Sequence, residues 1–508
     1  MKRWAWVLAA ALLLMAAGGV GVAAQDAAAT ETPAEDAAAR DAVSEAEAKL
    51  AAGDSDGAVK ALEDGMDVPG APGGQAALRL GALRESRGEL DNAIDAYVAA
   101  AERLEGAGKG EALGRLTVVQ YTRGMSEAPA SAEAAAAADP EGLWPTIAMS
   151  YRDVHGGKVD EGVALARKAV DAGGGPAAQG ALGYALQAQG DAAGAEAAYR
   201  GAMAADETQM GPVIGLASVL RISDRAAEAE PLLTRVLEAS PGAVEAYKEM
   251  ARVKIALNRA DEALGDASIA AAMAENDPSA QALVLEVKVA RALQELRGGN
   301  VALAEQDLTQ LREENPESPE VRLGLAWSQL ERGDNDAAIV ELTKATELAP
   351  ENAEAHYELG NVQLKKKSDP AAAVSPLEKA ASLDPGNATY LTAYGTALVG
   401  AQQFDRAVET LTAATALPGY ETAEGFFSLG QALVQLKRYT AAIPVLEKAA
   451  TLAPEAAPIW ATLAWAHFGL KDADNFKKAA AKAKGLGYAE PTLLNYLQEL
   501  SKPDAVIR

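Results

Sequence analysis

Apolar and small residues recur along the chain with a period close to 34 residues. A bulky residue followed by Gly or Ala forms the pairs Leu182-Gly183, Leu216-Ala217, Met250-Ala251, Leu325-Ala326, Leu359-Gly360, Tyr394-Gly395, Leu429-Gly430 and Leu463-Ala464. Most successive pairs are 34 or 35 residues apart, and the 75-residue step before Leu325 divides into 41 and 34 if Arg291-Ala292 is a weaker copy. A fixed period of this length is typical of repeat architectures.

A second series of small residues follows each pair by 12 to 13 positions. It consists of Ala195, Ala229, Ala263, Ala304, Ala338, Ala373, Ala407 and Ala442. Apolar residues stand four and seven positions later, as Leu342 and Ala345 do, and these offsets share one face of a helix. A polar turn such as 332–336 separates the two helices, and a proline such as Pro350 ends many units.

Each unit is therefore predicted to be a helix, a short turn and a second helix. Small residues such as Gly360 and Ala373 let the two axes approach closely. A single helical hairpin cannot bury its apolar face, whereas stacked copies can, which predicts a solenoid. No extended run with the period-two alternation of a strand stands out, so the fold class is all-α.

The pattern resembles the tetratricopeptide repeat family, with a large residue at position 4, Leu-Gly or Leu-Ala at 7 and 8, Ala at 20, a bulky residue at 24, Ala at 27 and Pro at 32. The best copies are 457–490 for the first helix and 319–352 for the second, carried by Trp460, Leu463, Ala464, Ala338, Leu342, Ala345 and Pro350. The resemblance implies a right-handed superhelical solenoid of antiparallel helix pairs.

The resemblance covers residues 141–490 most clearly. Residues 41–140 are predicted to hold divergent helical repeats, with one recognisable copy around Leu80 and Gly81, so we expect eleven to thirteen units. A linker is expected at 25–40, and the alanine-rich stretch 129–140 reads as a loop or linker. Residues 491–508 are predicted to be a capping helix and tail.

The first 24 residues have the pattern of a secretory signal peptide. Lys2 and Arg3 precede an uncharged run from Trp4 to Ala24, and Val22 and Ala24 are the small residues expected before a cleavage site. We therefore predict export, with a periplasmic or secreted location for the mature protein. An uncleaved anchor helix is the alternative, because 21 uncharged residues can just span a bilayer.

Composition narrows the possible functions. The 508 residues include no cysteine, which excludes disulfides, thiolate nucleophiles, cysteine zinc sites and a lipidated cysteine. The net charge is −26, and removal of Lys2 and Arg3 with the signal leaves 44 basic and 72 acidic residues, or −28. Such a surface repels phosphate backbones and anionic headgroups, so neither nucleic-acid binding nor peripheral membrane binding is expected.

Three features suggest chemistry, and each fits the repeat better. His155, His356 and His467 lie in different repeats, and His356 holds position 4, where a packing residue is expected. Residues 52–63 match part of a calcium loop but lack its first ligand, and the Arg-Gly-Asp at 332–334 lies in an interhelical turn. No other catalytic motif stands out, so we predict no enzyme activity, no metal site and no cofactor.

The inner surface of the solenoid is the predicted partner-binding site. In the family, the first helices line the concave groove through positions 2, 5, 9, 12 and 13. Those positions hold Tyr184, Lys248 and Arg252 in earlier repeats. In the later ones they hold the eight predicted groove residues: Trp327, Tyr357, Asn361, Leu364, Phe427, Gln431, Trp465 and Phe468. Either they form a groove for an extended or helical apolar peptide, or they pack against adjacent helices.

Some members of the family bind acidic C-termini through a Lys and Asn clamp, but here only Asn361 matches it. We therefore expect a non-catalytic scaffold or adaptor of the bacterial cell envelope, binding a protein or peptide in the groove. The alternatives are an accessory of envelope polysaccharide synthesis or export and a regulatory subunit of an envelope enzyme. Fold alone does not choose among them.

Overall fold

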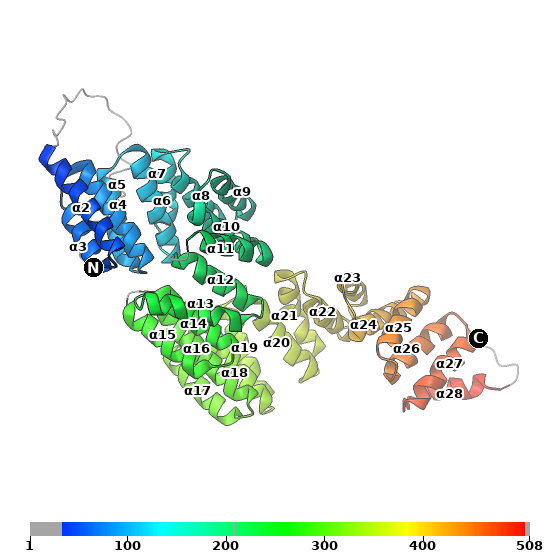
Figure 1. Ribbon diagram of the computed structural model, residues 1–508. Helices are drawn as coiled ribbons and strands as arrows, with labels where there is room; N and C mark the ends of the chain where they lie inside the picture. The colour runs from blue at the N-terminus through cyan, green and yellow to red at the C-terminus, as the bar shows by residue number, and fades with distance from the viewer. Residues whose placement is uncertain (1–32, 207–208, 276, 503–508) are drawn as a thin grey trace, which may run out of the picture. The chain divides into compact units, whose positions relative to one another are not determined.

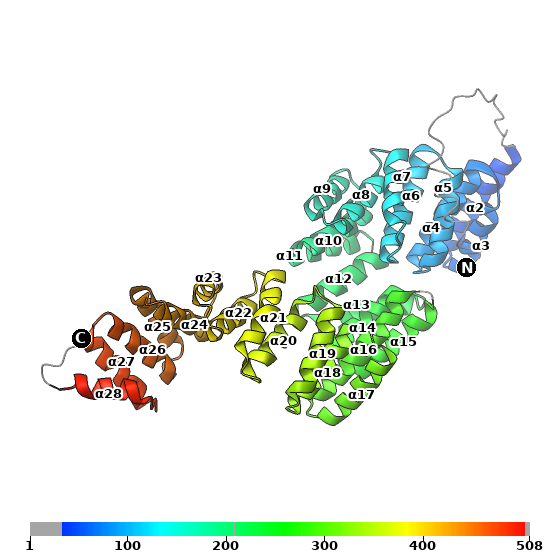
Figure 2. The same cartoon turned by 180° about the vertical axis from the view of Figure 1, so that it is seen from behind.

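The computed structural model describes residues 33–206, 209–275 and 277–502, which form twenty-seven helices and no strand. The all-α prediction is confirmed. The chain divides into two compact units, an N-terminal unit (residues 1–253) and a C-terminal unit (residues 254–508), with the boundary inside one helix. The stacked helix pairs of each unit are visible from both sides in Figures 1 and 2.

The first helices of the repeats carry even numbers. They are α2 (Pro33–Ala51), α4 (Gly70–Ser86), α6 (Gly106–Thr122), α8 (Leu143–His155), α10 (Gly175–Gln189), α12 (Met210–Ile222), α14 (Val244–Ala256), α16 (Pro278–Arg297), α18 (Pro319–Glu331), α20 (Ala353–Lys365), α22 (Ala388–Gly400), α24 (Ala423–Gln435) and α26 (Ala457–Gly469).

The second helices carry odd numbers, and one last helix follows them. They are α3 (Ser55–Met66), α5 (Leu90–Arg103), α7 (Ala128–Ala138), α9 (Val159–Asp171), α11 (Ala192–Ala205), α13 (Ala226–Ala239), α15 (Ala260–Met273), α17 (Val301–Glu314), α19 (Asn335–Leu348), α21 (Pro370–Leu383), α23 (Phe404–Thr415), α25 (Tyr439–Leu452), α27 (Ala473–Gly485) and finally α28 (Pro491–Leu500).

The even-numbered helices form the inner layer of each unit. Many successive ones contact each other, as α8 does with α10 and α22 with α24, in addition to contacting their own second helices. In the described part of the chain the odd-numbered helices show no comparable contacts with one another. Because helices on the inside of a curved stack lie closer together than those outside, the even-numbered helices line the concave face.

Aspartates in the interhelical turns begin several of the second helices. Asp334 accepts a hydrogen bond from Ala337 N at 3.1 Å, and Asp54 accepts one from Gly57 N at 2.9 Å. An N-cap carboxylate satisfies one of the free N–H groups of the first turn and favours its positive dipole end. These bonds account for both the Arg-Gly-Asp sequence and the calcium-like loop as elements of the repeat.

The small residue of the pair in the first helix lets a large side chain of the second helix lie against its backbone. In two repeats of the N-terminal unit this large residue is a tyrosine: Tyr97 lies against Gly81, and a Cβ added to Gly183 would lie 2.7 Å from Tyr199 Cδ1. In the C-terminal unit it is a leucine: a Cβ at Gly360 would lie 2.4 Å from Leu377 Cγ. Both contacts leave no room for a side chain on the first helix.

Helices occupy the described parts of two stretches expected as loops or linkers. Residues 129–140 were expected as a loop, but α7 occupies Ala128–Ala138 and packs on α6. Alanine has the highest helix propensity, Pro129 fits the first turn, and Ala132 and Ala135 are buried. Similarly, α2 begins at Pro33, inside the expected linker 25–40.

The 41-residue step in the repeat has a structural cause. It corresponds to α16, which has 20 residues where most first helices of the C-terminal unit have 13. Its residue Ala292 is fully buried at the position of the weaker pair. The extra residues therefore extend the repeat without interrupting the array.

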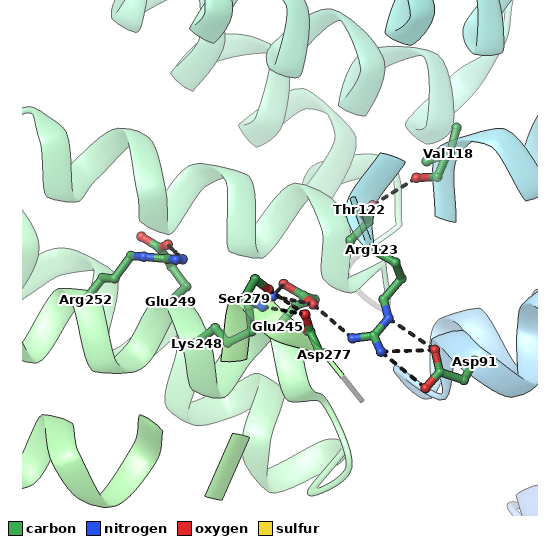
Figure 3. Close-up of polar contacts among 10 residues, drawn as sticks. All are labelled: Asp91, Val118, Thr122, Arg123, Glu245, Lys248, Glu249, Arg252, Asp277 and Ser279. Carbon is green, nitrogen blue, oxygen red and sulfur yellow. Dashed lines mark hydrogen bonds and ion pairs between the residues drawn. The ribbon is translucent and has the colours of Figure 1, made fainter. Parts of the chain in front are cut away.

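One set of contacts joins repeats of the N-terminal unit that are not neighbours. Arg123, at the end of α6, binds Asp91 of α5 through Nε and Nη2 at 3.1 and 3.2 Å, and its Nη1 lies 3.9 Å from Glu245 of α14 (Figure 3). Nearby, Gly88 approaches Ala243 so closely that an added Cβ would lie 2.9 Å from its Cα. The second repeat of this unit thus contacts its last helix.

The predicted signal peptide, residues 1–24, lies outside the described residues. Among the helices that the structure describes, none combines the length and apolarity that crossing a bilayer requires.

Candidate functional site

The eight predicted groove residues all lie on inner helices of the C-terminal unit. Each is half-buried, being neither enclosed in the core nor fully exposed. Trp327 packs against the core between α18 and α20, and Phe427 packs against the core that α24 shares with its neighbours. The inner face is therefore apolar over several repeats, and individual contacts determine which of its side chains remain available to a partner.

Tyr357 and Tyr390 form an aromatic pair across two repeats. Tyr357 lies on α20 and Tyr390 on α22, with ring centroids 5.1 Å apart and planes tilted by 34°. Both are half-buried beside the C-terminal core. Tyr390 is absent from the groove residues predicted from sequence, because it stands one repeat later at a different position of the motif.

Carboxylates surround this tyrosine pair. Burial raises the pKa of Tyr357, and the negative charges of Glu358 and Glu424 raise it further. Burial likewise raises the pKa of Tyr390, with additional effects from Glu354, Asp384 and Glu358. Since negative charge opposes ionisation of a phenol, both tyrosines are neutral donors.

Glu358 is the carboxylate most enclosed by this surface. Burial raises its pKa, the charge of Glu354 raises it further, and a hydrogen bond from Asn361 and the charge of Lys365 lower it. Glu354 and Glu424 are exposed. Within the part of the chain that the structure describes, no ion pair involves Glu354, Glu358 or Glu424. We call Tyr357, Tyr390 and these three glutamates the acidic tyrosine site.

The structure changes the interpretation of the segment around His356. Asn361 lies near enough to Glu358 to lower the pKa of that carboxyl. His356 points elsewhere, because its Nε2 donates to Pro350 O at 3.1 Å. Asn361 Oδ1 is buried and has no hydrogen-bond partner among the described residues.

The packing role of His356 recurs in other repeats. Trp460 Nε1 donates to Pro454 O at 2.8 Å, and the Arg322 guanidinium donates to Pro316 O, also six residues earlier. All three side chains hold position 4 of their repeats. The prediction that His356 is a packing residue therefore agrees with its contacts.

Trp465 and Phe468 lie at the last inner helix, where α28 covers them. The Tyr496 ring of α28 lies 6.0 Å from that of Trp465 and 4.7 Å from that of Phe468. Phe476 of α27, which is fully buried, contacts both from the other side. These two predicted groove residues thus pack mainly against aromatic neighbours of the chain's own end.

A second aromatic group lies on the inner helices of the N-terminal unit. Tyr121 and His155 stack at 4.2 Å, and Tyr151 and Tyr184 stack at 4.5 Å, with interplanar angles of 11° and 7°. Tyr184 Oη lies 2.7 Å from His155 Nε2. Burial lowers the pKa of His155, and burial raises that of Tyr184 to about 12. We call these four residues the stacked aromatic group.

Only Tyr184 of that group was predicted from sequence. The signal available was the rarity of aromatics, since Tyr151 and Tyr184 stand at equivalent places of consecutive repeats. Lys248 and Arg252, also projected onto the groove, each contact a glutamate of their own helix: Lys248 Nζ lies 2.9 Å from Glu245 and Arg252 Nη1 3.8 Å from Glu249 (Figure 3). Their charges are thus locally compensated.

Neither the histidines nor the surface hollow of the described residues adds to the candidate site. The three histidines lie on α8, α20 and α26, and no group of three or more His, Asp or Glu residues in the described ranges is arranged to hold a metal ion. A hollow of about 510 Å³ borders α9, lined by residues such as Asp160, Arg167 and Gln189, but it is open and lies on the outer layer. We assign no site to it.

Comparison with known proteins agrees with the repeat geometry. Models of the tetratricopeptide repeat match residues 43–108, 220–286, 289–342, 329–367 and 393–457. The fold and inner surface define a helical repeat protein of the solenoid class. Within that class, the chain belongs to the tetratricopeptide repeat proteins. No curated protein matches its sequence.

Several solved structures resemble it in repeat packing. YrrB, described as a TPR protein with an unusual peptide-binding site, is 22% identical over 38% of this chain and 97% of its own, with a TM-score of 0.34. The Cut9-Hcn1 complex of APC/C is 13% identical over 91% and 96%, with a TM-score of 0.37. PilW, a type IV pilus biogenesis factor, is 18% identical over 43% and 99%, with a TM-score of 0.35.

Proposed function

We propose that this protein is a non-catalytic scaffold of the bacterial cell envelope that binds a protein or peptide along the inner face of its C-terminal unit. The observation that carries this proposal is the row of half-buried aromatic and amide side chains on α18, α20 and α24. Apolar side chains that remain partly exposed in a concave surface favour binding of a polypeptide segment.

The amide side chains add a means of orienting that segment. Asn361 and Gln431 stand at the same position of their repeats, and both are half-buried. An amide side chain carries both donors and an acceptor, so these two residues are suited to bond the backbone of an extended segment.

Site-specific photocrosslinking in the source cells tests this proposal. A photoreactive phenylalanine analogue replaces Leu364 on inner helix α20 in one strain and Val340, which is 66% exposed on outer helix α19, in another. We expect a discrete crosslinked protein from position 364 and none from position 340. Equal labelling from both positions, or none from position 364, would contradict an inner-face binding site.

The envelope location rests on the pattern of residues 1–24 and has its own test. Cleavage after Ala24 leaves Gln25 as the first residue of the mature protein. N-terminal sequencing of protein from the periplasmic or secreted fraction should therefore begin at Gln25. Recovery of the intact Met1 terminus from the membrane fraction would instead indicate an uncleaved anchor.

A further inference from the structure

We infer that the acidic tyrosine site binds an arginine side chain of the partner polypeptide. This inference rests on the proposed function and specifies the chemistry of its ligand. Tyr357 and Tyr390 supply two neighbouring ring faces, and Glu354, Glu358 and Glu424 supply negative charge from α20 and α24. An aromatic face flanked by carboxylates attracts a cation through both the ring quadrupole and direct charge.

The site is electrostatically unbalanced without a ligand. Elsewhere in this unit the buried carboxylate of Glu341 is paired: it accepts from both Arg312 and Arg322 at 2.8 Å. At the acidic tyrosine site no such partner is present among the described residues, and Lys365 is the cation that acts on Glu358, with the smallest of the effects on its pKa. A bound guanidinium relieves the repulsion between Glu354 and Glu358.

Arginine fits better than lysine for geometric reasons. A guanidinium is planar, so it stacks on a tyrosine ring while its edge donates two parallel hydrogen bonds to a carboxylate. An ammonium group offers the charge without the planar face.

The overall charge of the protein agrees with a basic ligand. The net charge of −26 attracts cationic polypeptides over distances of about 10 Å at ordinary salt. That attraction is not specific to one place. The acidic tyrosine site differs from the general surface because its carboxylates flank two half-buried tyrosine rings on the concave side, where an extended segment makes other contacts too.

Isothermal titration with matched peptides tests the inference on the mature full-length protein. One short peptide, blocked at both ends, carries a single central arginine between leucines, and its partner carries citrulline, which has nearly the same shape without the charge. We expect the arginine peptide to bind about tenfold more tightly, since a partly desolvated cation–π contact with carboxylate support gives at least that preference. A lysine peptide should fall between the two.

Two double variants test whether the preference for arginine arises at the acidic tyrosine site. Glu354→Lys with Glu424→Lys reverses two exposed charges at the site and should abolish the preference for arginine over citrulline. Glu409→Lys with Glu447→Lys makes the same change in net charge on outer helices α23 and α25, where both residues are exposed, and should retain the preference. Because all four residues are exposed, neither variant is expected to unfold the protein.

The outcomes separate this inference from the proposed function. Equal affinities for arginine and citrulline peptides, or loss of the preference in the outer double variant, would overturn the arginine site. Crosslinking from position 364 does not depend on ligand charge, so a discrete crosslink together with equal peptide affinities would leave the scaffold role intact. The absence of any crosslink would count against the proposed function itself.

Discussion

The two units of the molecule use tyrosine in different ways within the same repeat. In the N-terminal unit, Tyr97 and Tyr199 fill the contact between first and second helices and are buried. In the C-terminal unit, leucines such as Leu377 and Leu411 fill that contact. Tyr357 and Tyr390 instead reach the inner surface. One repeat motif thus provides either structural or accessible aromatics, depending on which position holds them.

The inner-face aromatics differ in a second respect, namely their partners. In the stacked aromatic group the rings occupy one another's faces, and Tyr184 bonds to His155. At the acidic tyrosine site the nearest charged groups are carboxylates without ion pairs among the described residues. The first arrangement is internally satisfied and favours stability, whereas the second gains from an added cation. An inner-face aromatic therefore indicates a binding surface only if its neighbours leave it available to a ligand.

The largest expected effects concern the buried contacts. Tyr199→Ala and Leu377→Ala should each cost about 3 to 5 kcal/mol of folding free energy, because each leaves a cavity at a close helix contact. Hydrogen exchange should locate the loss of protection in the N-terminal unit for Tyr199→Ala and in the C-terminal unit for Leu377→Ala. Equal loss in both units from either variant would show that the units do not behave separately.

The next test removes one tyrosine of each inner-face group. Tyr184→Ala should destabilise the N-terminal unit by about 1 to 2 kcal/mol, since it loses a stacked ring and a hydrogen bond, and should leave peptide affinity unchanged. Tyr390→Ala should weaken the arginine peptide several-fold with a smaller change in stability. Denaturant titration and calorimetry measure the two effects. If Tyr184→Ala also reduces peptide affinity, the stacked aromatic group is not purely structural, and the contrast with the acidic tyrosine site is wrong.

Acid should weaken arginine binding at the acidic tyrosine site. The pKa of Glu358 is raised, by burial first and then by Glu354, so this carboxyl takes up a proton earlier than ordinary glutamates as the pH falls. The charged groups that act on Glu358 are Glu354 and Lys365, while Glu424 and the two tyrosines lie on the same surface. We expect the affinity for the arginine peptide to fall as the pH is lowered from 7 to 4. In the Glu358→Gln variant, the affinity should fall less at the less acidic end of this range.

The smallest expected effect is a pH dependence of the stacked aromatic group. The pKa of His155 is lowered by burial, so the folded state holds its proton less tightly than the unfolded state does. Its contribution to stability is therefore present above the unfolded pKa of about 6.5 and is lost as the pH falls through the folded pKa. Thermal melts of the wild type and His155→Phe from pH 8 to 5 should converge if His155 is responsible.

Sequence reasoning predicted the repeat but only part of the site. The spacing from Leu359-Gly360 to Ala373 predicted the two helices of the repeat, because close helix packing requires small residues at set offsets. Tyr390 was missed, since projecting one set of positions onto every repeat cannot show which side chains of neighbouring repeats meet. Its distance from Tyr357 depends on the superhelical geometry. Likewise, α7 was missed because alanine-rich sequence lacks the apolar contrast that marks a packed helix face.

The contact between Gly88 and Ala243 bears on how the N-terminal unit folds. Most solenoid contacts are local, so repeat proteins fold through short-range steps that spread from any point. These two residues are 155 positions apart, and the Arg123 contacts with Asp91 and Glu245 join the same region. Closing so long a loop adds a slow, cooperative step. The N-terminal unit is therefore expected to acquire its last native contacts only after the ribosome has released α14.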